Sequence, residues 1–385
     1  MTQIFNLRNA LAAAFLLPAG CSSWNPLVAM GIMGQPAHKP TPLAPIKASV
    51  TPRMAWSAQV GKAGGFAFRP NIADGRIYAA AADGSISVIE EATGRVAAKL
   101  ETKKPLSGGV DVGDGKIVAG TLKGEVVAVD LAGKPAWTTS VAGEIIAPPA
   151  FSGKTVLVRT ADGRIFGLSA EDGKRRWVFQ RPTPALLLRT SAGMMPLGRD
   201  VVAGYPNGKL IALDVDDGKL IWEVNVSVPR GATELERIAD VAGLPVVDGG
   251  TVCAAAYQGK VACFEIQSRN MLWSRDVSSS LSLAADKRLL YVIDDTGAIH
   301  GLDRASGASV WKQDGLRYRK LTSPVLFEGH LVVGDGFGFV HVLSAEDGSL
   351  IGRLASDASS VNWLVPGPAG LAMQTEKGTV ALVRF

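Results

Sequence analysis

The chain is poor in cysteine, in aromatic residues and in charge. It has 385 residues, of which 3 are cysteine, 6% are aromatic and 19% are charged. Three cysteines cannot form a disulfide framework, and Cys21, Cys253 and Cys263 lack the spacing of a zinc site. The formal net charge is +5, but no run of five or more Lys and Arg occurs, so nothing favours binding to nucleic acid. No segment has the 18 consecutive apolar residues of a transmembrane helix.

Sequence signatures of catalysis are missing as well. The four histidines (His38, His300, His330 and His341) do not have metal-ligand spacing. The chain also lacks the G-x-S-x-G, P-loop and H-E-x-x-H motifs. We therefore expect no catalytic residue, no bound metal and no cofactor. The low aromatic content also argues against a site for sugars or peptides built from aromatic side chains.

The N-terminus resembles the signal of bacterial lipoproteins. A short apolar run over residues 10–17 suits a secretory signal, and an Ala-Gly pair directly precedes Cys21. The resemblance implies that residues 1–20 are removed and that the Cys21 thiol receives a diacylglycerol, although Pro18 stands where the motif favours leucine. Ser22 after the cysteine implies the outer membrane. The alternative is an ordinary cleaved signal with an incidental cysteine.

A proline-rich stretch follows the cysteine. Six prolines occur between residues 26 and 52. Because proline fixes φ and lacks an N–H, such a segment cannot form regular structure easily. We expect residues 21–52 to be an extended tether.

The rest of the chain repeats a hairpin. A turn glycine between two apolar strands recurs about every 40 residues. These glycines are Gly84, Gly124, Gly163, Gly208, Gly259, Gly297, Gly338 and Gly378. Glycine supplies the positive φ that tight hairpin turns require. Since each copy has room for four short strands, the pattern predicts eight small antiparallel sheets.

A tryptophan is in phase with the repeat, near the end of most copies. The six positions are Trp56, Trp137, Trp177, Trp222, Trp273 and Trp311. In most copies a second glycine comes four residues before the tryptophan, but Arg269 replaces it before Trp273. The first and seventh copies have Ala98 and Gly352 in place of the tryptophan.

These signals predict an all-β fold, an eight-bladed β-propeller over residues 53–385. The period is that of propeller blades, and radial packing would bury the faces of the sheets. The last copy stops after three strands, and residues 53–60 form a strand with no partners of their own. We therefore expect this N-terminal strand to complete the last blade and close the ring.

The repeat unit, as in ALDVDDGKLIW, resembles the quinoprotein-type propeller repeat, in which the tryptophan packs on the neighbouring blade. Together with the lipoprotein signal, the chain from Cys21 onward resembles the BamB family. Those proteins are lipoprotein subunits of the machinery that inserts β-barrels into the bacterial outer membrane. The resemblance implies a non-catalytic scaffold that lies on the periplasmic side of that membrane. Its implied partners are the barrel subunit BamA, other lipoprotein subunits and unfolded barrel proteins.

Two connections between copies are longer than the others, around residues 181–196 and 227–242. In the BamB family, the matching segments contact the periplasmic POTRA domains of BamA. The residues that match these motifs are Leu186, Leu188, Arg189, Thr233, Glu234, Arg237 and Asp240. Ala242 departs from the motif, which has an acidic residue there. We expect a short helical stretch capped by Thr233.

Two alternatives remain. The leucines of the first long connection could pack between blades and leave Arg189 solvated. A quinone-dependent dehydrogenase on the same fold would need adjacent cysteines, calcium-binding Glu and Asn, and a catalytic Asp. The chain has no Cys-Cys pair. Cys253 and Cys263 flank the Gly259 hairpin, and we expect them to be buried free thiols rather than a cross-strand disulfide.

Overall fold

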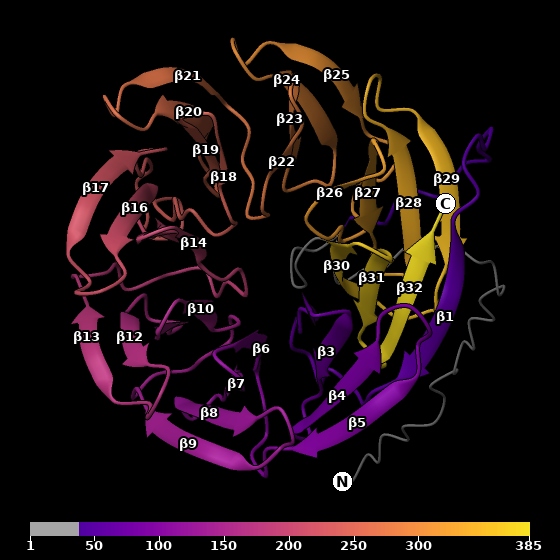
Figure 1. Cartoon of the computed structure of the whole chain (residues 1–385). Helices are drawn as coiled ribbons and strands as arrows, with labels where there is room; N and C mark the ends of the chain where they lie inside the picture. The colour runs from indigo at the N-terminus through magenta and orange to yellow at the C-terminus, as the bar shows by residue number, and fades with distance from the viewer. Residues whose placement is uncertain (1–37) are drawn as a thin grey trace, which may run out of the picture. The chain divides into compact units, whose positions relative to one another are not determined.

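The computed structural model describes residues 38–385, so Cys21 and the signal segment lie outside the described residues. The body from Pro40 to Phe385 consists of eight four-stranded antiparallel sheets arranged in a ring (Figure 1). The predicted eight-bladed propeller is therefore confirmed. Residues 38–385 contain no helix that could cross a membrane.

The strands follow one another with short connections in every blade. Blade 1 consists of β2 (Asn71–Ala73), β3 (Arg76–Ala80), β4 (Ser85–Glu90) and β5 (Val96–Glu101). Blade 2 consists of β6 (Gly108–Gly113), β7 (Lys116–Gly120), β8 (Glu125–Asp130) and β9 (Pro135–Ser140). Blade 3 consists of β10 (Ala150–Ser152), β11 (Thr155–Arg159), β12 (Ile165–Ser169) and β13 (Arg175–Phe179). Blade 4 consists of β14 (Met195–Leu197), β15 (Asp200–Tyr205), β16 (Lys209–Asp214) and β17 (Leu220–Asn225).

The second half of the ring repeats this order until the last blade. Blade 5 consists of β18 (Val246–Asp248), β19 (Thr251–Ala255), β20 (Val261–Glu265) and β21 (Met271–Arg275). Blade 6 consists of β22 (Ala284–Ala285), β23 (Leu289–Ile293), β24 (Ile299–Asp303) and β25 (Ser309–Gln313). Blade 7 consists of β26 (Val325–Phe327), β27 (His330–Gly334), β28 (Phe339–Ser344) and β29 (Leu350–Ala355). Blade 8 consists of β30 (Val361–Gly367), β31 (Gly370–Thr375), β32 (Thr379–Arg384) and β1 (Arg53–Gln59).

The N-terminal strand closes the ring, as predicted. β1 pairs antiparallel with β32, in a register that runs from Arg53 opposite Arg384 to Gln59 opposite Thr379. It forms the outer strand of blade 8, at the rim of the ring in Figure 1. Closure is tight at the turn before β32, because a Cβ added to Gly378 would lie 1.9 Å from the carbonyl oxygen of Gly61.

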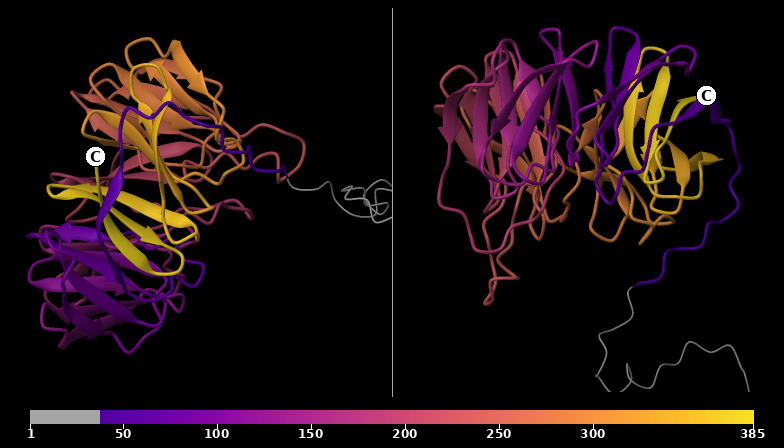
Figure 2. Two further views of the ribbon diagram at one scale, coloured as in Figure 1. Left: turned by 90° about the vertical axis from the view of Figure 1, so that its right-hand side faces the viewer. Right: turned by 90° about the horizontal axis from the view of Figure 1, so that it is seen from below.

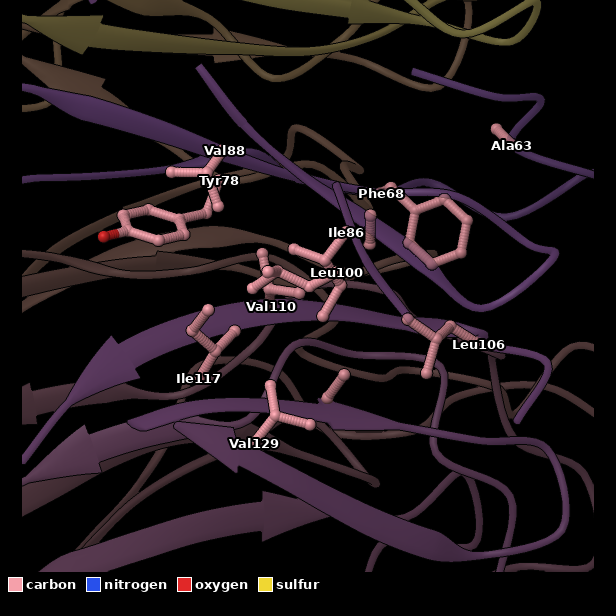
Figure 3. Close-up of a cluster of buried hydrophobic side chains, with 12 residues drawn as sticks. Ala63, Phe68, Tyr78, Ile86, Val88, Leu100, Leu106, Val110, Ile117 and Val129 are labelled. Atoms are coloured by element: carbon pink, nitrogen blue, oxygen red, sulfur yellow. The ribbon is translucent and has the colours of Figure 1, made fainter. Parts of the chain in front are cut away.

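The core lies between neighbouring blades. Figure 3 shows one such cluster, in which Tyr78 and Val88 of blade 1 face Ile117 and Val129 of blade 2. All four side chains are buried. Burying an aliphatic or aromatic side chain contributes about 1.5–3 kcal/mol. Each blade depends on its neighbour, because a single sheet would expose these faces.

The repeat tryptophans contact the following blade. The ring of Trp177 lies against Gly218 of blade 4, where an added Cβ would come within 2.5 Å of it. Its indole N–H donates to the carbonyl of Val215 at 2.9 Å. Equivalent bonds are made by four of the other tryptophans, namely Trp56 to Glu91, Trp137 to Ala170, Trp273 to Arg304 and Trp311 to Ala345.

Blade 5 departs from the pattern at both of its turns. Arg269 takes the place of the second glycine and adopts a φ of 63°. Its guanidinium donates to the carbonyl of Ile221, the residue before Trp222. In the hairpin between β19 and β20, Gln258 rather than Gly259 adopts the positive φ. The expectation of a left-handed glycine therefore fails in this copy, because its turn places the left-handed residue one position earlier.

The same hairpin corrects the expected state of the cysteines. Cys253 and Cys263 form a disulfide, with their Cα atoms 4.1 Å apart. The expectation of free thiols was wrong, because the pairing register places the two residues directly opposite each other on β19 and β20. Directly opposite residues point to the same face of an antiparallel sheet, so their sulfurs meet.

Candidate functional site

Two enlarged connections lie next to each other on one face of the ring. Connection 3–4 (residues 180–194) joins β13 to β14, and connection 4–5 (residues 226–245) joins β17 to β18. Because the strands of a blade are antiparallel, both emerge on the face that also carries the turns between each blade's second and third strands. We call this the connection face. The right-hand view of Figure 2 shows a salmon-coloured loop of this region projecting beyond the strand ends.

Asp240 belongs to connection 4–5 and links it to connection 3–4 from the interior of the protein. Its side chain is buried, with the residue only 5% exposed. One carboxylate oxygen accepts the backbone N–H of Leu188 at 2.8 Å, and the other accepts the N–H of Asn207 at 3.2 Å. Charge-assisted bonds of this kind are stronger than neutral ones and fix the segments that donate them. Asp240 therefore holds connection 3–4 in place and does not present its charge at the surface.

Burial dominates the electrostatics of this carboxylate. It raises the pKa of Asp240, while the N–H bonds from Leu188 and Asn207 and the charge of Arg159 act in the opposite direction. Arg159 ends β11 and is itself buried, which lowers its pKa. Two desolvated charges of opposite sign thus lie beneath the connections. Removing either would leave the other without its compensating charge.

A second link involves the backbone at Ala242. The hydroxyl of Thr190 donates to the carbonyl of Ala242 at 2.6 Å. The methyl side chain of Ala242 is buried. At this position, where the sequence resemblance led us to expect an acidic residue, the chain contributes a backbone contact between the two connections.

Arg189 points outward and contacts a third connection. Its guanidinium lies 2.9 Å from a carboxylate oxygen of Glu144, with the side chains 60% and 46% exposed. Glu144 belongs to the connection between blades 2 and 3 (residues 141–149). Exposed pairs of this kind contribute less than about 1 kcal/mol to stability. The arginine is thus held in place without being removed from solvent.

Connection 4–5 contains one capped turn and not the expected helical stretch. The hydroxyl of Thr233 accepts the N–H of Glu236 at 3.3 Å, and the Glu236 carboxylate accepts the N–H of Thr233 at 3.0 Å. This reciprocal pair has the pattern of a capping box. Only a single turn follows. Thr233 therefore caps the turn as expected, but no helix forms. Glu234 and Arg237 lie exposed on this turn, and the Arg237 Nε donates to the carbonyl of Gly231.

Apolar side chains surround these polar groups. Leu186 is 40% exposed in connection 3–4, whereas Val228 and Leu235 are 64% and 66% exposed in connection 4–5. Leu188 is half-buried at the inner side of its connection. The alternative of inward packing thus describes Leu188 but not Leu186. Reasoning from sequence missed Val228, which lies next to the matched motif and not within it.

The connections border a hollow at the centre of the face. This hollow has a volume of about 360 Å³ and is lined by Leu188 and Arg189 on one side and by Lys320 and Trp363 on the other. Seven of its lining residues carry hydroxyl groups, and none of the lining residues that the structure describes is acidic. Within residues 38–385, no group of three or more His, Cys, Asp or Glu side chains is placed to hold a metal ion.

Comparisons with known proteins agree on one family. A family model described as outer membrane protein assembly factor BamB matches residues 82–313. The curated protein of that name from Nitrosomonas eutropha is 43% identical over 330 residues, which cover 84% of this chain and 80% of the relative. The crystal structure of BamB from Moraxella catarrhalis superposes with a TM-score of 0.81 at 26% identity, covering 87% of this chain and all of that one.

The fold extends beyond this family. The quinohemoprotein alcohol dehydrogenase from Comamonas testosteroni superposes with a TM-score of 0.70, covering 86% of this chain and 76% of the enzyme. Its sequence identity is only 12%, so this likeness concerns the propeller fold alone.

Proposed function

Because the chain belongs to the BamB family of outer membrane protein assembly factors, we propose that it is a lipid-anchored scaffold of the β-barrel assembly machinery. In this proposal the Cys21 lipid holds the protein on the periplasmic side of the outer membrane. Connections 3–4 and 4–5 dock it on the POTRA domains of BamA. The protein acts in outer membrane protein assembly and not as an enzyme.

The paired connections are the observation that supports docking. Asp240 and Thr190 join two loops that come from different blades, so the loops present one continuous surface. On that surface Leu186 and Leu235 expose apolar area beside Arg189 and Arg237. Arginine is enriched among the residues that dominate interface binding energy, and a partner would bury the apolar area beside it. Pre-arranged loops also lose less conformational entropy on binding.

The roles of the individual residues follow from their exposure. We propose that Leu186, Arg189 and Arg237 contact the partner directly, together with Thr233 and Glu234 on the capped turn. Asp240 and the backbone at Leu188 position that surface from inside.

The test is co-purification of BamA from detergent-solubilised membranes with wild type and with Arg189→Glu. The variant places a carboxylate next to Glu144 and reverses the charge offered to the partner. We expect recovery of BamA to fall at least about tenfold, which corresponds to 1.4 kcal/mol. Arg199→Glu is the matched control, because Arg199 is also an exposed, ion-paired arginine, and it pairs with Asp216 in the turns of blade 4 away from the connection face.

Three outcomes are informative. Loss in Arg189→Glu alone supports the docking surface. Equal recovery of BamA with both variants would show that the interface lies elsewhere on the protein. No recovery of BamA with wild type would refute BamA as the partner. The anchor is tested separately, because a Cys21→Ala protein that stays in the membrane fraction would contradict a lipid attachment at this residue.

Unfolded barrel proteins are a further proposed partner. The outer strands β17 and β21 expose Leu220, Ile221, Met271 and Leu272. An exposed outer strand can accept an extended chain by strand addition. Photo-crosslinkers placed on these strands should capture nascent barrel proteins, and their failure to do so would remove this part of the proposal.

A further inference from the structure

The segment before the first strand is bound along blade 7. Residues 40–52, which we call the strap, contain no strand or helix but make backbone hydrogen bonds to the propeller. The N–H of Thr41 donates to the carbonyl of Arg317 at 3.0 Å. The N–H groups of Ser49 and Val50 donate to the carbonyl of Ile351 at 2.9 and 3.1 Å. The strap therefore runs from connection 6–7 (residues 314–324) to the start of β29.

Two arginines of the propeller hold the strap by its carbonyl groups. Arg319 donates to the carbonyl of Thr41 at 3.1 Å, and Arg353 donates to that of Ala44 at 3.2 Å. Between these points Leu43 packs against the hydrophobic cluster shared by blades 6 and 7. Arginine suits this task, because its planar group offers several donors in fixed directions.

A buried network fixes the first of these arginines. Asp335 is completely buried and accepts the Nε–H of Arg319 at 2.7 Å. The same carboxylate lies 3.0 Å from the Nε2 of His341, which is also completely buried. Buried charges persist when they are paired and hydrogen-bonded. Asp335 takes the Nε–H of Arg319, and the Nη1 of the same buried side chain donates to the strap at Thr41.

The strap also fills the place of a missing tryptophan. Gly352 of β29 stands where six other blades carry tryptophan, and a Cβ added there would lie 2.9 Å from the carbonyl oxygen of Val50 and 3.1 Å from Pro52. In the other blades the tryptophan packs on a turn between the third and outer strands of the next blade. Blade 8 has no such turn, because its outer strand comes from the other end of the propeller sequence. The strap therefore covers the outside of blade 7, where the other blades have a tryptophan side chain.

We propose that blade 7 is a docking track for residues 40–52, and that the track fixes the point at which the chain leaves the propeller. That point is Thr41, beside connection 6–7, on the connection face. The right-hand view of Figure 2 shows the indigo segment crossing the outside of the ring toward the side on which the salmon loop projects. The anchored end of the chain thus leaves from the face that carries connections 3–4 and 4–5, at the opposite side of the ring.

The strap also limits how far the propeller can lie from its anchor. This consequence rests on the proposed lipid at Cys21. With the strap bound, residues 22–39 separate the lipid from the strap, and 18 residues span at most about 65 Å when fully extended at 3.3–3.6 Å per residue. Releasing the strap would add 13 residues, or at most about 45 Å.

The strap itself is tested by amide hydrogen exchange on the full-length protein. Thr41, Ser49 and Val50 should exchange more slowly than free peptide, by at least tenfold. Gly352→Leu should remove that protection at Ser49 and Val50, because the added side chain occupies their place. Ala98→Leu is the matched control, since Ala98 holds the equivalent position in blade 1, away from the strap. Exchange at the free-peptide rate in wild type would overturn the proposal, as would unchanged protection in a folded Gly352→Leu protein.

The limit on reach is tested with a shortened spacer. Deleting residues 24–35 should reduce co-purification of BamA at least tenfold. Adding Gly352→Leu together with Leu43→Asp, which disrupt the contacts at both ends of the strap, should restore it. If the deletion has no effect, or if release of the strap restores nothing, the limiting role of the strap is refuted. If the wild-type protein does not bring down BamA, the proposed function is refuted instead. The hydrogen-exchange experiment would still test the strap, because it does not depend on BamA.

Discussion

The link between the two enlarged connections through Asp240 can be tested by substitution at one position. Asp240→Ala would leave the N–H groups of Leu188 and Asn207 without their acceptor. Each buried donor left without a partner costs about 1–3 kcal/mol. Relief from burying a carboxylate, whose pKa is raised by that burial, offsets part of this cost. We expect a net local destabilisation of about 1.5–3 kcal/mol.

Amide exchange at the two donors measures this local effect directly. A cost of about 1.5–3 kcal/mol corresponds to exchange that is roughly 10–150 times faster at Leu188 and Asn207. Amides in distant blades should keep their protection. Binding of BamA should weaken as well, although Asp240 is buried. If both amides keep their wild-type rates in a folded Asp240→Ala protein, Asp240 does not join the connections.

The isosteric variant Asp240→Asn separates charge from shape. Since burial raises the folded-state pKa of Asp240, its contribution to stability is present below the unfolded pKa of about 3.9 and is lost as pH rises through the folded value. The stability of wild type relative to Asp240→Asn should therefore fall as pH rises through this window. A difference that instead grows with pH would show that the hydrogen bonds outweigh the cost of burying the charge.

Three further predictions concern the stability of the ring, measured by chemical or thermal unfolding. Trp177→Ala should cost about 3–5 kcal/mol, because a buried ring and its hydrogen bond are both lost; a cost below about 1 kcal/mol would contradict its packing role. Gly378→Ala should lower the melting temperature far more than Gly115→Ala. Both glycines have positive φ, but only at Gly378 would the new Cβ lie 1.9 Å from a backbone oxygen. Equal effects would mean that the backbone shifts to remove this clash. Replacing Cys253 and Cys263 with alanine should cost about 2–3 kcal/mol for a closed loop of this length, and labelling of the native unreduced protein by a thiol reagent at these residues would refute the disulfide.

The repeat predicted most of the architecture. Turn glycines and tryptophans recur at a constant spacing, and such local signals determine where strands begin and end. The number of blades and the closure by β1 followed from counting copies and finding one strand too few at the end. The candidate surface could also be located, because the two extra lengths of chain fall between neighbouring copies.

Other features depended on register or on contacts between distant residues. The disulfide required Cys253 and Cys263 to be opposite each other, and a turn one residue longer would have separated them. The capped turn at Thr233 stops before it becomes a helix, which its sequence alone did not indicate. The strap on blade 7 connects residues about 300 positions apart, such as Ala44 and Arg353, so no local pattern reveals it.

Asp240 shows most clearly what each level decides. Its sequence motif placed it in the candidate surface, and the motif could not say whether its carboxylate faces solvent or the interior. Only the packed structure shows that it is buried beneath Leu188 and Asn207, which belong to segments about 50 and 30 residues away. The sequence by itself thus determined the repeated strands and their number, because these depend on local spacing. The tertiary structure alone decided which side chains are exposed for a partner and which join the loops, because burial depends on residues brought together only when the ring closes.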